Sequence, residues 1–465
     1  MDRNGVLVNV RDLLRGPVAR HLFALSVPIL ADLAIINLYF LVDLYFIARL
    51  GDAPTAGVSA AGSVLFLFTA FMQIMNVGTS LLMANAAGRR DREAIRRILQ
   101  QSLLLGGGLG VVVLLLGYWL SPPYLRSLTA DETAARFGIS YLFWLFPGLW
   151  IQFAVSTMRA ALRGLGAVRV ATTVQLITVG LNIALAPVLI AGIGTSHALG
   201  VPGAALARTL AIVVSAIILW RYLDRHIGFR AAGWRPESTQ LRRVLWLGLP
   251  ASGEMLLMFA YTSVCYWAIR DLGSDTQAAF AVTSRVLQVL YLPVMAVAFA
   301  LVPLAGQNLG GGNTDRAVRA FKTALASNLS FSLLVAIACE LYPMAFVQGL
   351  SPPGSAVAQA SLMLDVLTWS LVPIAIVFSC SSAMQALGNT LFSLLTSCIR
   401  LASFAAPLLF IPLAPERSLE MMLNLSVWTL VLQAIVSLVW LAKTYRARAA
   451  RGAWVPVAQE QAPLR

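Results

Sequence analysis

Long apolar runs recur from one end of the chain to the other, and they constrain its fold more than any other feature. Each is roughly 20 residues long, enough to cross a hydrocarbon core of about 30 Å. We place twelve spans at 20–47, 56–84, 97–119, 137–158, 170–192, 202–220, 244–269, 278–305, 323–344, 358–384, 392–413 and 421–442. Lipid offers the backbone no hydrogen-bond partner, and no run shows the alternation of a barrel strand. The sequence therefore predicts an all-α integral membrane protein.

The charged residues support this class and give an orientation. Only 12% of the chain is charged, against about a quarter in soluble proteins. The net charge of +14 does not indicate nucleic-acid binding, because 26 of the 34 basic residues fall in, or at the edge of, the N-terminal segment, every second loop and the C-terminal tail. Only five lie in the opposite loops, and Arg208, Arg285 and Arg400 fall inside spans. The positive-inside rule then predicts that both termini are cytoplasmic.

Targeting, redox and metal signals are weak. The first apolar run is too long for a cleavable signal peptide. The four cysteines stand singly in apolar runs, and the three histidines flank spans far apart in the sequence. We expect core cysteines, no cofactor, and no metal beyond a transported sodium ion.

An internal repeat organises the chain, and one constant shift along the sequence superposes its two copies. The shift carries Pro28 onto Pro250, Leu50-Gly51 onto Leu272-Gly273, Gly88 onto Gly310, and Leu165-Gly166 onto Leu387-Gly388. The predicted parts are a cytoplasmic segment 1–19, an N-lobe 20–220, a cytoplasmic linker 221–243, a C-lobe 244–443 and a disordered cytoplasmic tail 444–465. Six is an even number of spans, so both lobes enter the membrane with the same orientation. This predicts two six-helix bundles related by a pseudo-twofold axis along the membrane normal, as in transporters that use alternating access.

Four motifs narrow the family. They are MANAAGRRDREAIRR (83–97), AGQNLGGGNTDRAVRAFK (305–322), LVDLYFIARLG (41–51) and LRGLGAVR (162–169). Together the sequence resembles the multidrug and toxic compound extrusion (MATE) transporters of bacteria over residues 20 to 443. The resemblance implies no enzyme activity, a multi-pass protein of the bacterial inner membrane, and export of small amphipathic, mostly cationic drugs or toxic metabolites in exchange for protons or sodium ions. We expect a monomer.

Two acids interrupt the first span. Asp32 and Asp43 differ by roughly 20° around a helix and lie about 16 Å apart along it, so they share one face. An ionised carboxylate in lipid costs at least ~2.5 kcal/mol, so this face must meet protein or water. Either acid is a protonatable or cation-binding group, or it is structural, being neutral or paired with an arginine. Asp43 occupies the position that resembles the ion-coupling aspartate of the family.

The repeat places Asp32 on Glu254, four residues after Pro28 and Pro250 respectively. We expect these two acids to face each other across a cleft and attract cations. A proline inside a helix permits a bend, and a bend at Pro28 would link the charge of the acids to the shape of the first helix. The alternative is that both prolines lie in the first turns and merely start the regular helix.

The sequence departs from the family at the ion site. Asn182 is kept, but Ala186 stands where relatives carry an acid, and Arg208 stands where a small hydroxyl residue is usual. Sodium prefers several oxygen ligands with no fixed cation beside them, so these changes favour proton coupling, with sodium as the alternative. Arg208 pairs with Asp43 or Asp32, or it snorkels to the interface.

Polar, aromatic and methionine side chains suit a substrate cleft. The candidates are Glu254, Asn37, Tyr39, Gln73, Asn76 and Met258, although such residues are more often simple packing. A second hypothesis is a lipid-linked oligosaccharide flippase of related architecture. An enzyme would need a nucleophile–base pair, a metal cluster or a phosphate loop within the spans, and the sequence shows none.

Overall fold

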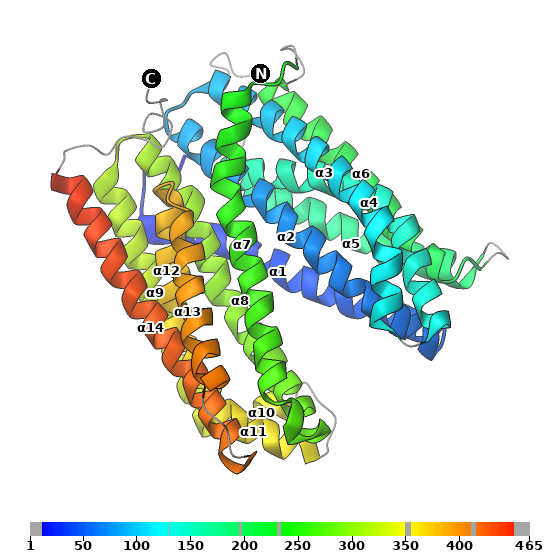
Figure 1. Ribbon diagram of the computed structural model, residues 1–465. Helices are drawn as coiled ribbons and strands as arrows, with labels where there is room; N and C mark the ends of the chain where they lie inside the picture. The colour runs from blue at the N-terminus through cyan, green and yellow to red at the C-terminus, as the bar shows by residue number, and fades with distance from the viewer. Residues whose placement is uncertain are drawn as a thin grey trace. The chain divides into compact units, whose positions relative to one another are not determined.

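The computed structural model describes residues 12–129, 131–194, 198–229, 234–348, 355–410 and 415–450 (Figure 1). The side chains of a few residues within these ranges, Tyr39 among them, are outside the description. The described residues form helices and no strand. Twelve helical segments are long and apolar enough to cross a membrane, one at each predicted span. The predicted fold class is confirmed.

The chain forms two compact units. Unit 1 comprises Met1–Asp12 and Ala31–Ser252, and unit 2 comprises Leu13–Leu30 and Gly253–Arg465. The helices are α1 (Val18–Ala48), α2 (Asp52–Gly88), α3 (Arg92–Leu128), α4 (Glu132–Gly164), α5 (Val168–Ala191), α6 (Val201–Ile227), α7 (Ser238–Ala268), α8 (Ser274–Gly310), α9 (Thr314–Leu341), α10 (Pro343–Gln348), α11 (Ser355–Leu367), α12 (Leu371–Ala386), α13 (Leu391–Phe410) and α14 (Pro415–Ala450). The boundary between the units crosses α1 and α7 two residues after Pro28 and Pro250.

Both prolines lie deep inside their helices, which excludes the alternative that they merely start them. The first part of α7 packs closely within unit 1. A Cβ atom on Gly248 would lie 2.1 Å from the carbonyl oxygen of Ile74 in α2, and one on Gly78 would lie 2.4 Å from that of Val244. Small residues that let helix backbones touch are the usual device for helix association in lipid.

Backbone turns repeat with the same shift that carries Pro28 onto Pro250. It carries both ends of α2 onto those of α8, and the first residue of α3 onto that of α9. Left-handed or otherwise positive φ values occur at paired positions: 113° and 92° at Gly51 and Gly273, 77° and 81° at Gly166 and Gly388, and 57° and 79° at Arg90 and Gly312. Such φ values are costly for residues with a Cβ atom, so glycine holds five of the six positions.

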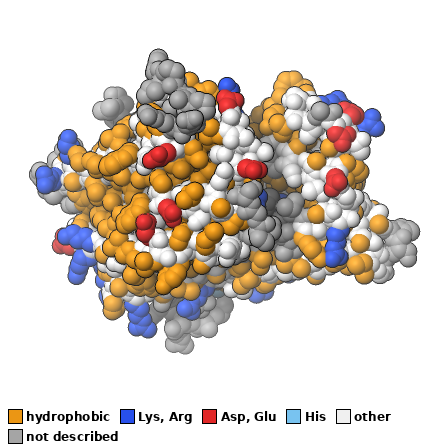
Figure 2. Space-filling view, turned by 90° about the horizontal axis from the view of Figure 1, so that it is seen from below, with side chains coloured by type: hydrophobic (Ala, Val, Ile, Leu, Met, Phe, Trp, Pro, Cys, Tyr) orange, Lys and Arg blue, Asp and Glu red, His pale blue; other side chains and the backbone are white. Residues whose placement is uncertain are grey.

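Large apolar side chains cover much of the outside. Trp119, Leu334, Leu409 and Trp428 are each at least two-thirds exposed. Figure 2 shows hydrophobic side chains spread over the viewed face, with charged ones scattered among them. A soluble protein rarely exposes so much apolar surface, whereas lipid-facing helices require it.

The helices extend further than the predicted spans. The fourth span was predicted to end at 158, because Arg159 and Arg163 were counted with the cytoplasmic loop, but α4 continues to Gly164. No proline or internal glycine separates residues 158 and 163, so the helix has no reason to stop there. In the same way α14 continues to Ala450, into the region predicted as a disordered tail.

Candidate functional site

Unit 1 holds a cluster around Asp43, which we call the Asp43 cluster: Asp43, Tyr141, Asn182 and Arg208. The amide nitrogen of Asn182 in α5 donates a hydrogen bond to Oδ1 of Asp43 at 3.1 Å. Nη1 of Arg208 in α6 lies 3.8 Å from Oδ2 of Asp43 and donates to the Tyr141 hydroxyl at 3.5 Å. Of the two predicted partners for Arg208, the structure therefore selects Asp43.

This cluster offers few free oxygen atoms to a metal ion. Its carboxylate already faces a guanidinium, and Ala186, one turn after Asn182, is buried and brings no ligand. The side-chain oxygen of Asn182 is buried and has no hydrogen-bond partner among the described residues. Within the same residues, no group of three His, Cys, Asp or Glu could hold a metal. The Asp43 cluster thus brings one carboxylate, one amide oxygen and one phenol oxygen, beside a guanidinium group.

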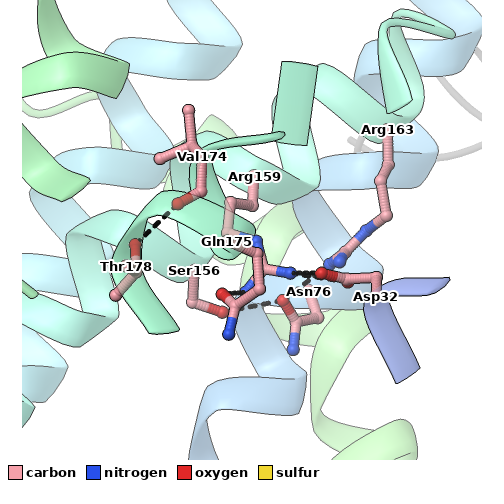
Figure 3. A network of polar contacts seen from close by, with 8 residues as sticks. All are labelled: Asp32, Asn76, Ser156, Arg159, Arg163, Val174, Gln175 and Thr178. Atoms are coloured by element: carbon pink, nitrogen blue, oxygen red, sulfur yellow. Dashed lines mark hydrogen bonds and ion pairs between the residues drawn. The ribbon is translucent and has the colours of Figure 1, made fainter. Parts of the chain in front are cut away.

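The other acid of α1 belongs to a second cluster of unit 1. Nη2 of Arg159 in α4 donates to both carboxylate oxygens of Asp32, at 2.5 and 2.6 Å, and both side chains are about nine-tenths buried. Figure 3 shows the pair at close range. The predicted alternative in which Asp32 pairs with an arginine is the one found, and a charge-assisted contact of this length is a strong one.

A second set of hydrogen bonds lies beside this pair, centred on Asn76 and reaching Arg163 one turn after Arg159 in α4, and the two sets together involve four helices. Asn76 of α2 accepts hydrogen bonds from Ser156 at 2.7 Å and from Nη2 of Arg163 at 2.9 Å. Its amide nitrogen donates to Gln73 at 2.6 Å. Nη1 of Arg159 donates to Gln175 of α5 at 2.7 Å (Figure 3). We call Asp32, Gln73, Asn76, Ser156, Arg159, Arg163 and Gln175 the arginine network.

Arg159, Arg163 and Tyr141 were not predicted as site residues from the sequence. The two arginines are four residues apart, so they share a helix face, and that spacing was the available signal. Which face of α4 turns inward is a tertiary property, because Arg159 meets an acid 127 residues away.

The remaining predicted residues are more dispersed. Asn37 is exposed and donates to the carbonyl of Leu33, one turn before it, at 2.9 Å. Glu254 and Met258 lie in α7 within unit 2, half-buried and exposed respectively. Asp32 lies in unit 1, so its predicted approach to Glu254 across a cleft stays a prediction, as does the cleft lining by Asn37, Tyr39 and Met258.

Comparison with known families finds the same repeat. The model of the family described as MatE matches residues 28–188 and again 250–411. The two matches start at Pro28 and Pro250, the first pair of residues that the repeat superposes.

Individual relatives are distant but cover most of the chain. The protein named "Probable multidrug resistance protein YoeA" of Bacillus subtilis (strain 168) is 24% identical over 85% of this chain and 87% of its own. A protein named "FAD transporter" of Shewanella oneidensis is 26% identical over 85% and 88%. Among solved structures, an outward-facing multidrug resistance MATE family transporter of the MOP superfamily is 25% identical, with a TM-score of 0.85 over 94% of this chain and 97% of that one.

Proposed function

Because the chain belongs to the MatE family of membrane transporters, we propose that it exports small amphipathic organic molecules in exchange for a cation, and that this cation is the proton. Its twelve spans and its bacterial relatives make it a multi-pass inner-membrane transporter and not an enzyme. The flippase alternative gains no support from the family or from these relatives. Cytoplasmic termini remain the orientation we propose from the distribution of basic residues.

One observation carries the choice of the proton: Arg208 stands 3.8 Å from the Asp43 carboxylate, inside a membrane helix. A tethered guanidinium neutralises the ionised Asp43 carboxylate and competes with any sodium ion that approaches it. A proton needs no coordination shell, so it binds the carboxyl oxygen without displacing several ligands. Protonation removes the negative charge that faces Arg208, whose side chain is one-quarter exposed.

This change of partners supplies the coupling. Asp43 belongs to α1 and Arg208 to α6, so protonation of Asp43 weakens the contact between these two helices, while Asn182 of α5 can still donate to the carboxyl group. In our proposal, proton uptake from outside releases α1 from α6 and favours the state that discharges substrate. Proton release to the cytoplasm restores the ion pair and resets the transporter.

Transport with sodium present and absent, at fixed pH, tests the coupling ion. In everted vesicles with a preset proton gradient, adding a transported compound is expected to dissipate the gradient equally with sodium or with choline. A sodium-dependent response, or transport without proton movement, would overturn the proton assignment.

The names of the relatives cover substrates of different charge. The family resemblance favours cationic amphipathic compounds, while the relatives above carry names that range from multidrug resistance to FAD, an acidic molecule. The charge that the membrane interior presents to a substrate is therefore the property that decides this question.

A further inference from the structure

The arginine network contains more positive charge and more hydrogen-bond donors than the protein itself satisfies. From this surplus we infer that the network binds the acidic group of an organic anion, a carboxylate or phosphate on a small amphipathic molecule. The inference rests on the proposed export function and names the substrate class for it.

The charge balance is the first argument. Arg159 and Arg163 bring two positive guanidinium groups into the network. Its one carboxylate, on Asp32, balances one of these charges. Arg163 makes its hydrogen bond to an uncharged amide, at 2.9 Å. A guanidinium stays protonated, so the network keeps a net charge of +1. A fixed positive charge within a membrane protein is costly, and an anion that balances it recovers that cost.

The orientation of the amides is the second argument. Arginine only donates hydrogen bonds, so Asn76 must turn its oxygen to Arg163, and Gln175 must turn its oxygen to Arg159. Asn76 then offers its nitrogen to Gln73, whose oxygen accepts it. Each amide oxygen of the network is thereby used, whereas the amide nitrogens of Gln73 and Gln175 have no acceptor among the described residues.

Unpaired N–H groups in the arginine network are the third argument for an anionic ligand. Nε of Arg159 is buried without a hydrogen-bond partner in the described part of the chain. Gln73, Arg163 and Gln175 are half-buried, so their open N–H groups are reachable from outside the network. A set of N–H groups around a net positive charge is complementary to carboxylate and phosphate oxygens, and it repels cations.

The position of the network suits uptake from the cytoplasm. Arg163 is the penultimate residue of α4, next to the basic segment that the positive-inside rule assigns to the cytoplasm. An exporter takes its substrate from that side. An acid that enters there meets Arg163 first and Arg159 one turn deeper.

A matched pair of probes tests the inference by equilibrium binding. Riboflavin and flavin mononucleotide (FMN) share one aromatic body and differ by a phosphate, and both are fluorescent. Titrated against the purified full-length protein in phosphatidylcholine nanodiscs, FMN is expected to bind about tenfold more tightly than riboflavin, or better. Equal affinities would overturn the inference. Binding needs no ion gradient, so a failure of the proposed proton coupling would leave this result unchanged.

Single substitutions test whether the arginine network causes the preference for FMN over riboflavin. Arg163→Gln is expected to lower FMN affinity to that of riboflavin, Arg163→Lys to keep most of it, and Asp32→Asn to raise it, because the net charge becomes +2. Arg169→Gln makes the same charge change on an exposed side chain of α5 and should have no effect. An equal loss in Arg169→Gln, or none in Arg163→Gln, would assign FMN to the basic surface and contradict the inference. Thermal unfolding confirms that each variant is folded.

Anionic lipid headgroups also present phosphate oxygens that could bind the network, so a separate experiment distinguishes them from a free organic acid. The titration is repeated in nanodiscs that contain phosphatidylglycerol. Unchanged FMN affinity supports a free organic acid as the ligand. A loss of affinity that Arg163→Gln abolishes would assign the network to a lipid headgroup and overturn the inference.

Discussion

The two units share a backbone pattern but differ in the chemistry of equivalent positions. The repeat shift carries Asp43, Tyr141 and Asn182 of unit 1 onto Cys265, Met363 and Phe404 of unit 2. These three are buried members of one hydrophobic core cluster. The repeat thus places a carboxylate and an amide at these positions in unit 1 and apolar or weakly polar side chains in unit 2, where the charged group nearby is Arg400, stacked 4.0 Å from the Tyr261 ring centroid.

The acids Asp32 and Glu254 also occupy equivalent positions and differ in their surroundings. Asp32 is bound by Arg159, whereas the residues equivalent to Arg159 and Arg163 are Ser381 and Gln385. Glu254 has no hydrogen bond or ion pair among the described residues. Among the described residues, the equivalent positions therefore carry an acid in both units and a bound counter-charge in unit 1.

The largest difference between the units should appear in coupling. Asp43→Asn is expected to reduce proton-coupled export to the background rate, because asparagine neither takes up nor releases a proton. Cys265→Ala, at the equivalent core position, should keep most of the activity. The measurement is proton release from everted vesicles, with ethidium and FMN as test substrates. If Asp43→Asn couples as well as the parent, the coupling site lies elsewhere.

The two equivalent acids should differ in stability. Asp32→Asn leaves the buried guanidinium of Arg159 without its counter-charge, which is expected to cost about 3 kcal/mol. Glu254→Gln breaks no such pair and should change stability by less than about 1 kcal/mol. Thermal unfolding of both variants in one detergent compares them. The double variant Asp32→Asn with Arg159→Met should recover most of the loss, and its failure to do so would show that the ion pair is not the cause.

The spans, the repeat and part of the Asp43 cluster could be predicted from the sequence. Hydropathy located all twelve spans, since lipid selects apolar residues at every turn of a span. One constant shift revealed the repeat, because the turns between helices need glycine at fixed positions such as Gly166 and Gly388. Asp43, Asn182 and Arg208 were proposed together from motif positions, and the structure brings them into one cluster.

The rotation of each helix about its axis, and the partner of each buried charge, could not be predicted from the sequence. Arg159 and Arg163 were counted as loop charges because a charged residue ended the apolar run, although the helix continues through them. Nothing local indicates that Arg159 meets Asp32 and not solvent. That choice depends on how α1 and α4 pack, and on the cost of leaving either charge alone.

The ion preference of unit 1 should be changeable. Ala186→Asp with Arg208→Ser adds a carboxylate and removes the fixed cation, which gives the Asp43 cluster the oxygen ligands that sodium needs. We expect sodium, but not choline, to raise the thermal unfolding midpoint of this double variant and to leave the parent unchanged. The same variant carrying Asp43→Asn is the control. If sodium leaves the unfolding midpoint of the double variant unchanged, Arg208 does not determine the ion preference.

The smallest effect concerns one turn. Arg90 adopts a left-handed φ of 57° where the repeat has Gly312 at 79°. Arg90 is exposed, and its ion pair with Asp12, at 3.8 Å, is of the surface kind that contributes little. Arg90→Gly should therefore stabilise unit 1 by up to about 1 kcal/mol, while Gly312→Ala should destabilise unit 2 by about the same amount, because a Cβ atom disfavours this φ. Thermal unfolding of each variant, compared with the parent, shows whether its stability rises or falls. A shift of the same sign in both would show that the left-handed backbone is not what distinguishes these equivalent turns.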